Sequence, residues 1–77
     1  MYYEINVSLN GHHFFATAER SITSIYELKK VYPVIRAKFP ETEGYEITVT
    51  YEEQVGHFIS DVDLYLKKEL GDKYVNN

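Results

Sequence analysis

The sequence predicts a two-layer α+β domain of the order ββαβα, in which a three-stranded antiparallel sheet of order 2-1-3 has its helices packed on one face. Three observations predict this fold. Apolar and polar residues alternate in two segments, an Asn-Gly pair follows the first of them, and a third segment has apolar residues three and four apart. At 77 residues the chain has room for one hydrophobic core, so we expect a single small globular domain spanning residues 1–77.

The first hairpin is predicted from residues 2–19. Apolar residues alternate with polar ones over residues 2–9, which is the pattern of a strand with one buried face. Asn10 and Gly11 follow, and this pair favours a two-residue type I′ turn because both residues tolerate positive φ. Residues 12–19 then form the returning strand.

A regular register assigns each residue of this hairpin to a face of the sheet. A two-residue turn pairs Val7 with Phe14 and Ile5 with Ala16, and cross-strand partners share a face. We therefore expect Phe14 on the face that the helices cover. Phe15 is expected on the opposite face, which we call the open face.

Residues 24–39 form the first predicted helix. Ser24 and Glu27 have the spacing of a capping box, in which each side chain accepts a hydrogen bond from the backbone at the helix start. The apolar residues of this segment share one stripe: Ile25, Leu28, Tyr32, Ile35 and Phe39. Pro33 interrupts the helix without shifting the phase of the stripe, so we expect one kinked helix, with two short helices as the alternative.

The last two elements are a strand over residues 45–53 and a short helix. Every second residue of the strand is polar, and this set faces the open side: Glu46, Thr48, Thr50 and Glu52. Ser60 and Asp63 resemble a second N-cap box, and Gly71 ends the helix that follows. Residues 72–77 are expected to form a frayed tail.

Composition excludes several classes of protein. The chain has no cysteine, which excludes disulfide scaffolds and Cys-ligated zinc. Its eight basic and twelve acidic residues give a net charge of −4, which disfavours binding to nucleic acid or to an anionic membrane. No apolar run approaches the ~20 residues of a membrane span, and no secretory signal is evident, so we expect a cytoplasmic protein.

The candidate metal-ligating residues have simpler explanations. His12 and His13 are adjacent in a strand, so they point to opposite faces and cannot chelate one ion. His57, Asp61 and Asp63 form an H-x3-D-x-D pattern, but the two carboxylates diverge at a helix start, where they complement the helix dipole. We therefore expect no metal site.

No residue has the surroundings that catalysis needs. The sequence lacks a Gly-x-Ser-x-Gly elbow and a glycine-rich phosphate loop. Ser8 and His13 are predicted cross-strand neighbours, but no orienting acid or oxyanion donor accompanies them. We therefore expect a protein that is not an enzyme and has no cofactor.

The function that remains is non-catalytic binding of another protein, of the inhibitor or adaptor type. Eight tyrosines support this prediction, because tyrosine offers a large contact area at low entropic cost. Phe15 is an aromatic residue expected on the open face, among polar and acidic residues, which is typical of an interface hot spot with a polar rim. The candidate site comprises Tyr2, Glu4, Phe15, Thr17, Glu46, Thr48 and Glu52. The acidic residues favour a partner with a basic surface.

Two alternative functions stay open. Lysines on the helices allow a nucleic-acid-associated module. The exposed edge of the third strand at residues 47–50 allows pairing with a second copy, as in a small homodimeric structural subunit. The small size, the many tyrosines and the six lysines against two arginines give the chain the composition of a phage or bacterial accessory protein.

Overall fold

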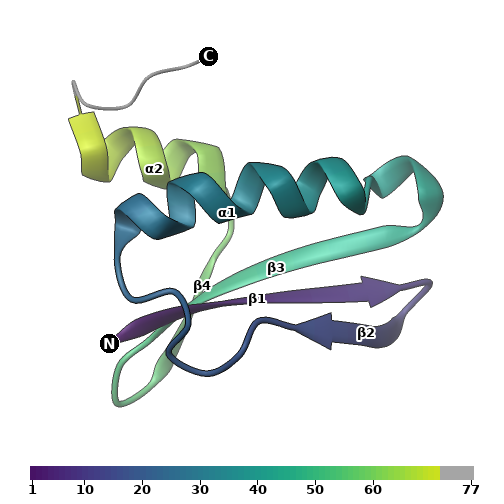
Figure 1. Cartoon of the computed structure of the whole chain (residues 1–77), viewed down its shortest axis with the longest axis horizontal. Helices are drawn as coiled ribbons and strands as arrows, with labels where there is room; N and C mark the ends of the chain where they lie inside the picture. The colour runs from purple at the N-terminus through teal and green to yellow at the C-terminus, as the bar shows by residue number, and fades with distance from the viewer. Residues whose placement is uncertain (72–77) are drawn as a thin grey trace.

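The computed structural model describes residues 1–71 and has the order ββαββα (Figure 1). The strands are β1 (Tyr2–Leu9), β2 (His12–Ala16), β3 (Tyr45–Glu52) and β4 (Gly56–Ile59). The helices are α1 (Ile25–Lys38) and α2 (Val62–Leu70), and a short 3-10 helix, η1 (Glu41–Glu43), precedes β3. The expected fraying of residues 72–77 concerns a segment outside the described residues.

The sheet has four antiparallel strands in the order β2-β1-β3-β4. The α+β class is therefore confirmed, whereas the three-stranded sheet is wrong, because β4 pairs with the side of β3 that was expected to be free. Val49 pairs with Ile59 and Thr50 with Phe58, so half of the expected open edge at residues 47–50 is covered. With only four residues, β4 is too short for alternation to reveal it.

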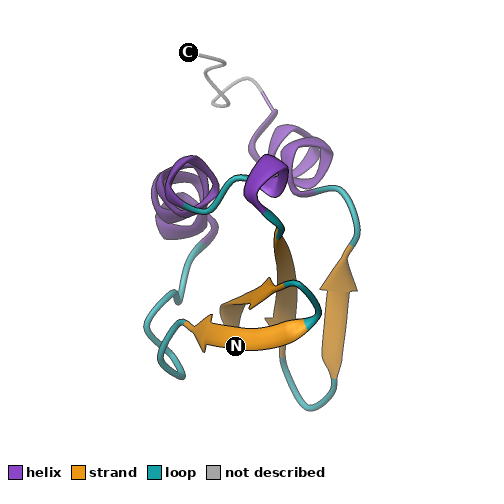
Figure 2. Cartoon of the chain, turned by 90° about the vertical axis from the view of Figure 1, so that its right-hand side faces the viewer, coloured by secondary structure: helices purple, strands orange, loops and turns teal. Residues whose placement is uncertain are grey.

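Both helices lie over the same face of the sheet (Figures 1 and 2). The core fills the space between the two layers, and its largest fully buried side chains come from both: Ile5, Leu28, Leu66, Val7 and Val49. Within residues 1–71 the other face of the sheet has no helix over it, so this is the open face. No helix in that range is long and apolar enough to cross a membrane.

The turn of the first hairpin lies at Asn10-Gly11, as predicted. Asn10 has φ 50° and Gly11 has φ 86°, the left-handed values that a type I′ turn requires. The backbone N–H of Asn10 also donates to the carbonyl of Gly44 over 3.0 Å, which joins this turn to the start of β3.

A β-bulge in β2 overturns the predicted register. Ser8 pairs with His13, but the next pair joins Val7 to Phe15, so Phe14 is an extra residue without a partner in β1. The expected faces of the two phenylalanines are therefore wrong. Phe15 lies on the helix-covered face and packs against the core, whereas the side chain of Phe14 is 51% exposed.

An aromatic cluster explains why the bulge is favoured. The ring centroid of Phe15 lies 5.2 Å from that of Phe39, and the centroid of Phe14 lies 5.8 Å from those of both Phe39 and Tyr45. Adjacent residues of a regular strand point to opposite faces. The extra residue lets both phenylalanines reach the same cluster at the end of α1.

Helix α1 begins close to where the sequence places it. Ser24 is its N-cap, and the Ser24 hydroxyl accepts from the backbone N–H of Glu27 over 3.2 Å. The Glu27 carboxylate accepts from the N–H and the hydroxyl of Thr23, one residue earlier than the capping box predicts. The helix continues through Pro33 without a break, so the alternative of two short helices is wrong.

Helix α2 begins one residue later than predicted. Its N-cap is Asp61 rather than Ser60, because the Asp61 carboxylate accepts from the backbone N–H of Leu64 over 3.0 Å. Aspartate caps as well as serine does, and its charge also complements the helix dipole. Gly71 ends the helix with φ 55°, as the sequence predicts.

Candidate protein-binding surfaces

The open face carries side chains from β1, β3 and β4. Cross-strand pairing sets two rows of neighbours at the end where β4 lies, namely Glu4–Thr50–Phe58 and Tyr2–Glu52–Gly56. Residues in such rows share a face, and this face is opposite to the one that buries Ile5 and Val49.

Phe58 is the prominent apolar residue of this surface. It is 78% exposed, the highest value among the large hydrophobic side chains of residues 1–71. Its cross-strand neighbour Thr50 is buried. The sequence missed Phe58 because the segment that contains it was not recognised as a strand. The exposed aromatic residue of the open face is Phe58 on β4, at the opposite edge of the sheet from β2, where Phe15 was expected to be exposed.

Carboxylates surround Tyr2 on the same surface. Partial desolvation, followed by the charges of Glu19, Glu52 and Glu4, raises the pKa of the Tyr2 hydroxyl, while Arg20 acts in the opposite direction. Glu4, Glu19 and Glu52 thus place three carboxylates near Tyr2 at this end of the sheet. We call Tyr2, Glu4, Glu52 and Phe58 the Phe58 surface.

The remaining predicted site residues lie elsewhere. Phe15 packs against the core on the other face. Thr17 is engaged with β1, because its hydroxyl accepts from the N–H of Ile5 and its own N–H donates to the Ile5 carbonyl, both over 3.0 Å. Glu46 and Thr48 are on the open face, but near the other end of β3, opposite Ser8 and Asn6 of β1.

A second surface lies where β3 extends beyond β4. Strand β4 pairs with residues 49–52 only, so residues 45–48 have β1 on one side and no strand from residues 1–71 on the other. The Asn10 N–H donates to the Gly44 carbonyl, so Asn10 and Gly44 form a hydrogen-bonded pair between the two strands. Hydrogen-bonded pairs alternate with non-hydrogen-bonded pairs along an antiparallel ladder, so Tyr45 and Ile47 do not bond to β1. Accordingly, the N–H and C=O groups of Tyr45 and Ile47 point away from β1, toward the free edge.

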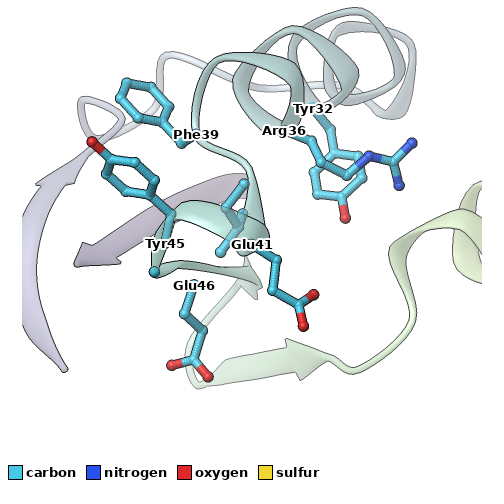
Figure 3. A pocket seen from close by; sticks show the side chains of 8 residues that line it. Tyr32, Arg36, Phe39, Glu41, Tyr45 and Glu46 are labelled. Carbon is cyan, nitrogen blue, oxygen red and sulfur yellow. The ribbon is translucent and has the colours of Figure 1, made fainter. Parts of the chain in front are cut away.

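A groove of about 480 Å³ runs beside this free edge (Figure 3). It is lined by Tyr32, Arg36 and Phe39 from α1, by Glu41 and Gly44, and by Tyr45, Glu46 and Ile47 from β3. We call these residues the edge groove. In Figure 3 the aromatic rings lie toward α1, and the carboxylates of Glu41 and Glu46 extend away from that helix.

The edge groove has an excess of negative charge. The Arg36 guanidinium forms an ion pair with Asp63 of α2 over 2.8 Å and lies 5.2 Å from the ring centroid of Tyr32. The positive charge of Arg36 is thus already matched by a carboxylate. Within residues 1–71 Glu41 and Glu46 form no ion pair, so they leave the groove acidic.

The residues of the H-x3-D-x-D pattern are dispersed in the structure. His57 faces Tyr51 across the β3–β4 ladder, with ring centroids 6.3 Å apart. Asp61 caps α2, and Asp63 pairs with Arg36. Within residues 1–71 no three histidine, aspartate or glutamate side chains are grouped as a metal site requires.

No protein-family model, no curated protein and no solved structure matches this chain. Its function is therefore inferred from the Phe58 surface and the edge groove.

Proposed function

We propose that this chain is a small non-catalytic protein-binding module, an accessory protein of the inhibitor or adaptor type that acts in the cytoplasm. In this proposal it binds a partner with a basic surface through the Phe58 surface. The observation that supports the proposal is the 78% exposure of Phe58 on a sheet face that also carries Tyr2, Glu4 and Glu52.

Burial of the exposed phenyl ring of Phe58 would stabilise a complex. In the isolated chain the Phe58 side chain gains little from folding, because most of it stays in water. Complete burial by a partner would contribute about 2–3 kcal/mol. An exposed aromatic residue inside a polar rim is the usual arrangement of an interface hot spot.

The carboxylates contribute mainly to partner choice. Charges at the rim of an interface accelerate association with an oppositely charged partner and repel partners of the same sign, and they add less to the affinity itself. Glu4 and Glu52 therefore favour a partner that brings lysine or arginine residues around an apolar depression.

The nucleic-acid alternative has less support on this face. Stacking of a base on Phe58 would bring phosphates near Glu4 and Glu52, and the chain already has a net charge of −4. Phosphate contacts supply most of the affinity of nucleic-acid binders, so carboxylates beside the stacking ring oppose such binding.

Affinity capture tests the proposal. The immobilised chain, its Phe58→Ser variant and a Val34→Ser control are each exposed to a lysate of the source cells, with and without nuclease treatment. Val34 is a suitable control because it is also exposed and apolar but lies on α1. We expect a protein retained by the wild type and by Val34→Ser to be lost with Phe58→Ser and to bind more weakly as salt is raised.

Two outcomes would contradict the proposal. Equal capture by both variants, with unchanged melting temperatures, would exclude the Phe58 surface as the contact. Capture that disappears on nuclease treatment would favour the nucleic-acid-associated module instead.

A further inference from the structure

We propose that the free edge of β3 at residues 45–48 binds an extended segment of another protein, which adds to the sheet beside β3 and places a basic side chain opposite Glu46. This proposal specifies a second mode of the protein-binding function. It depends on the edge groove and shares no residue with the Phe58 surface.

The edge of β3 at residues 45–48 has unpaired backbone groups within residues 1–71. The N–H and C=O groups of Tyr45 and Ile47 point outward, and no partner for them is present within residues 1–71. Such unpaired strand edges accept an added strand through main-chain hydrogen bonds. Proteins commonly protect an edge with proline, lysine or a bulge, whereas residues 45–48 read Tyr-Glu-Ile-Thr.

The path of β4 leaves the position beside residues 45–48 vacant. β4 ends at Ile59, opposite Val49, and the chain then turns away to the Asp61 cap of α2. A continuation of β4 would have paired with residues 45–48. An added segment of about four residues, roughly 13 Å long, fits the same place.

The edge groove and Glu46 favour particular side chains in a bound segment. Residues of the segment opposite Tyr45 and Ile47 point toward the helices, into the groove beside Tyr32 and Phe39. The residue between them points to the open face, directly across from Glu46. The favoured segment is therefore apolar–basic–apolar, with lysine or arginine at its centre.

A second copy of the chain fits this edge poorly. Antiparallel pairing that uses Tyr45 and Ile47 of both copies sets Tyr45 of one opposite Ile47 of the other, which leaves Glu46 opposite Glu46. This central pair is of the non-hydrogen-bonded kind, in which side chains come closest, and like charges there are destabilising. The predicted homodimer through this edge is therefore disfavoured relative to a basic segment from a different protein.

Defined peptides test the charge preference. The probes are an acetylated, amidated peptide of alternating valine and lysine and a matched peptide with glutamate in place of lysine. We expect the lysine peptide to slow hydrogen exchange at the Tyr45 and Ile47 amides and to bind about fivefold more tightly than the glutamate peptide. In Glu46→Lys the preference should reverse.

A pair of variants at one position tests the backbone contact. Ile47→Pro removes an outward N–H that the β1–β3 ladder does not use, while Ile47→Ala loses the side chain but keeps the N–H. We expect the alanine variant to bind the lysine peptide about tenfold more tightly than the proline variant, as loss of a main-chain hydrogen bond predicts. If the proline variant does not fold, the reversal in Glu46→Lys decides the question.

Several outcomes would overturn the proposal. Equal affinity for both peptides, or unchanged exchange at Tyr45 and Ile47 at millimolar peptide, would exclude strand addition here. Protection of these amides that grows with protein concentration in the absence of peptide would identify a second copy as the occupant. Phe58→Ser should leave peptide binding unchanged, so failure of this site is distinguishable from failure of the Phe58 surface.

Discussion

The hydroxyl oxygens of Tyr3 and Tyr65 lie 2.8 Å apart, and the hydrogen bond between them joins the sheet to α2. Tyr3 is only 2% exposed, and the two rings meet edge to face with their centroids 6.1 Å apart. Burial, and then the hydrogen bond to Tyr65, raises the pKa of the Tyr3 hydroxyl. The contact therefore places a neutral polar pair at the boundary between the two layers.

Removal of this hydrogen bond should weaken the packing of α2. In Tyr65→Phe the ring remains, but the Tyr3 hydroxyl loses its partner, so we expect a loss of about 1–2 kcal/mol in the free energy of unfolding. Urea denaturation measures this loss. Tyr26→Phe is the matched control because Tyr26 is exposed on α1, and an equal loss in both variants would contradict a specific role for the Tyr3–Tyr65 bond.

The raised pKa of Tyr3 predicts a dependence of stability on alkaline pH. The folded chain keeps Tyr3 neutral at a pH where the unfolded chain ionises it, from about pH 10 upward. The stabilisation is complete below that pH and declines as the pH rises toward the folded-state pKa. As the pH is raised above about 10, the melting temperature of Tyr3→Phe should fall less than that of the wild type. An equal fall in both proteins would mean that other tyrosines cause the loss of stability.

The bulge predicts unequal consequences for the two adjacent phenylalanines. Phe15→Ala removes a side chain that packs against the core and Phe39, so we expect a loss of about 3 kcal/mol in unfolding free energy. Phe14→Ala removes a half-exposed ring and should cost about 1 kcal/mol. Denaturant titration compares them, and the opposite ranking would indicate the regular register without the bulge.

Replacement of the proline inside α1 should not harm the fold. Pro33 is exposed, and it has no N–H to donate to the carbonyl one turn back. Pro33→Ala restores that donor at the cost of a more flexible unfolded chain, so we expect a gain of about 1–2 kcal/mol. Thermal melting measures the change. A large loss would mean that the proline shapes a bend on which the packing of α1 depends.

Local signals predicted much of this fold. The Asn10-Gly11 turn, the Ser24 cap and the alternation in residues 45–52 each depend on neighbouring residues, so the sequence reveals them without knowledge of the rest of the molecule. The four residues of β4 carry no comparable signal, because Gly56 and His57 leave too little alternation. Missing β4 also meant missing the main residue of the candidate site, Phe58.

The register of β2 could not be predicted locally for a different reason. Phe14 and Phe15 are equally apolar, so the pattern gives no preference between a regular strand and one with a bulge. The choice depends on Phe39 and Tyr45, which are distant in sequence and meet these rings only after the fold has formed. The face assigned to Phe15 was wrong because its neighbours in space were unknown.

The strand order has a consequence for synthesis on the ribosome. β1 is made first, yet it is an inner strand, and pairing of Tyr2 with Glu52 must wait until β3 has emerged. Until then the nascent β1–β2 hairpin exposes Ile5 and Val7 together with an unsatisfied strand edge, a combination that promotes aggregation. The sheet therefore stays incomplete until β3 has been made, and slow codons between residues 17 and 44 would lengthen the vulnerable interval.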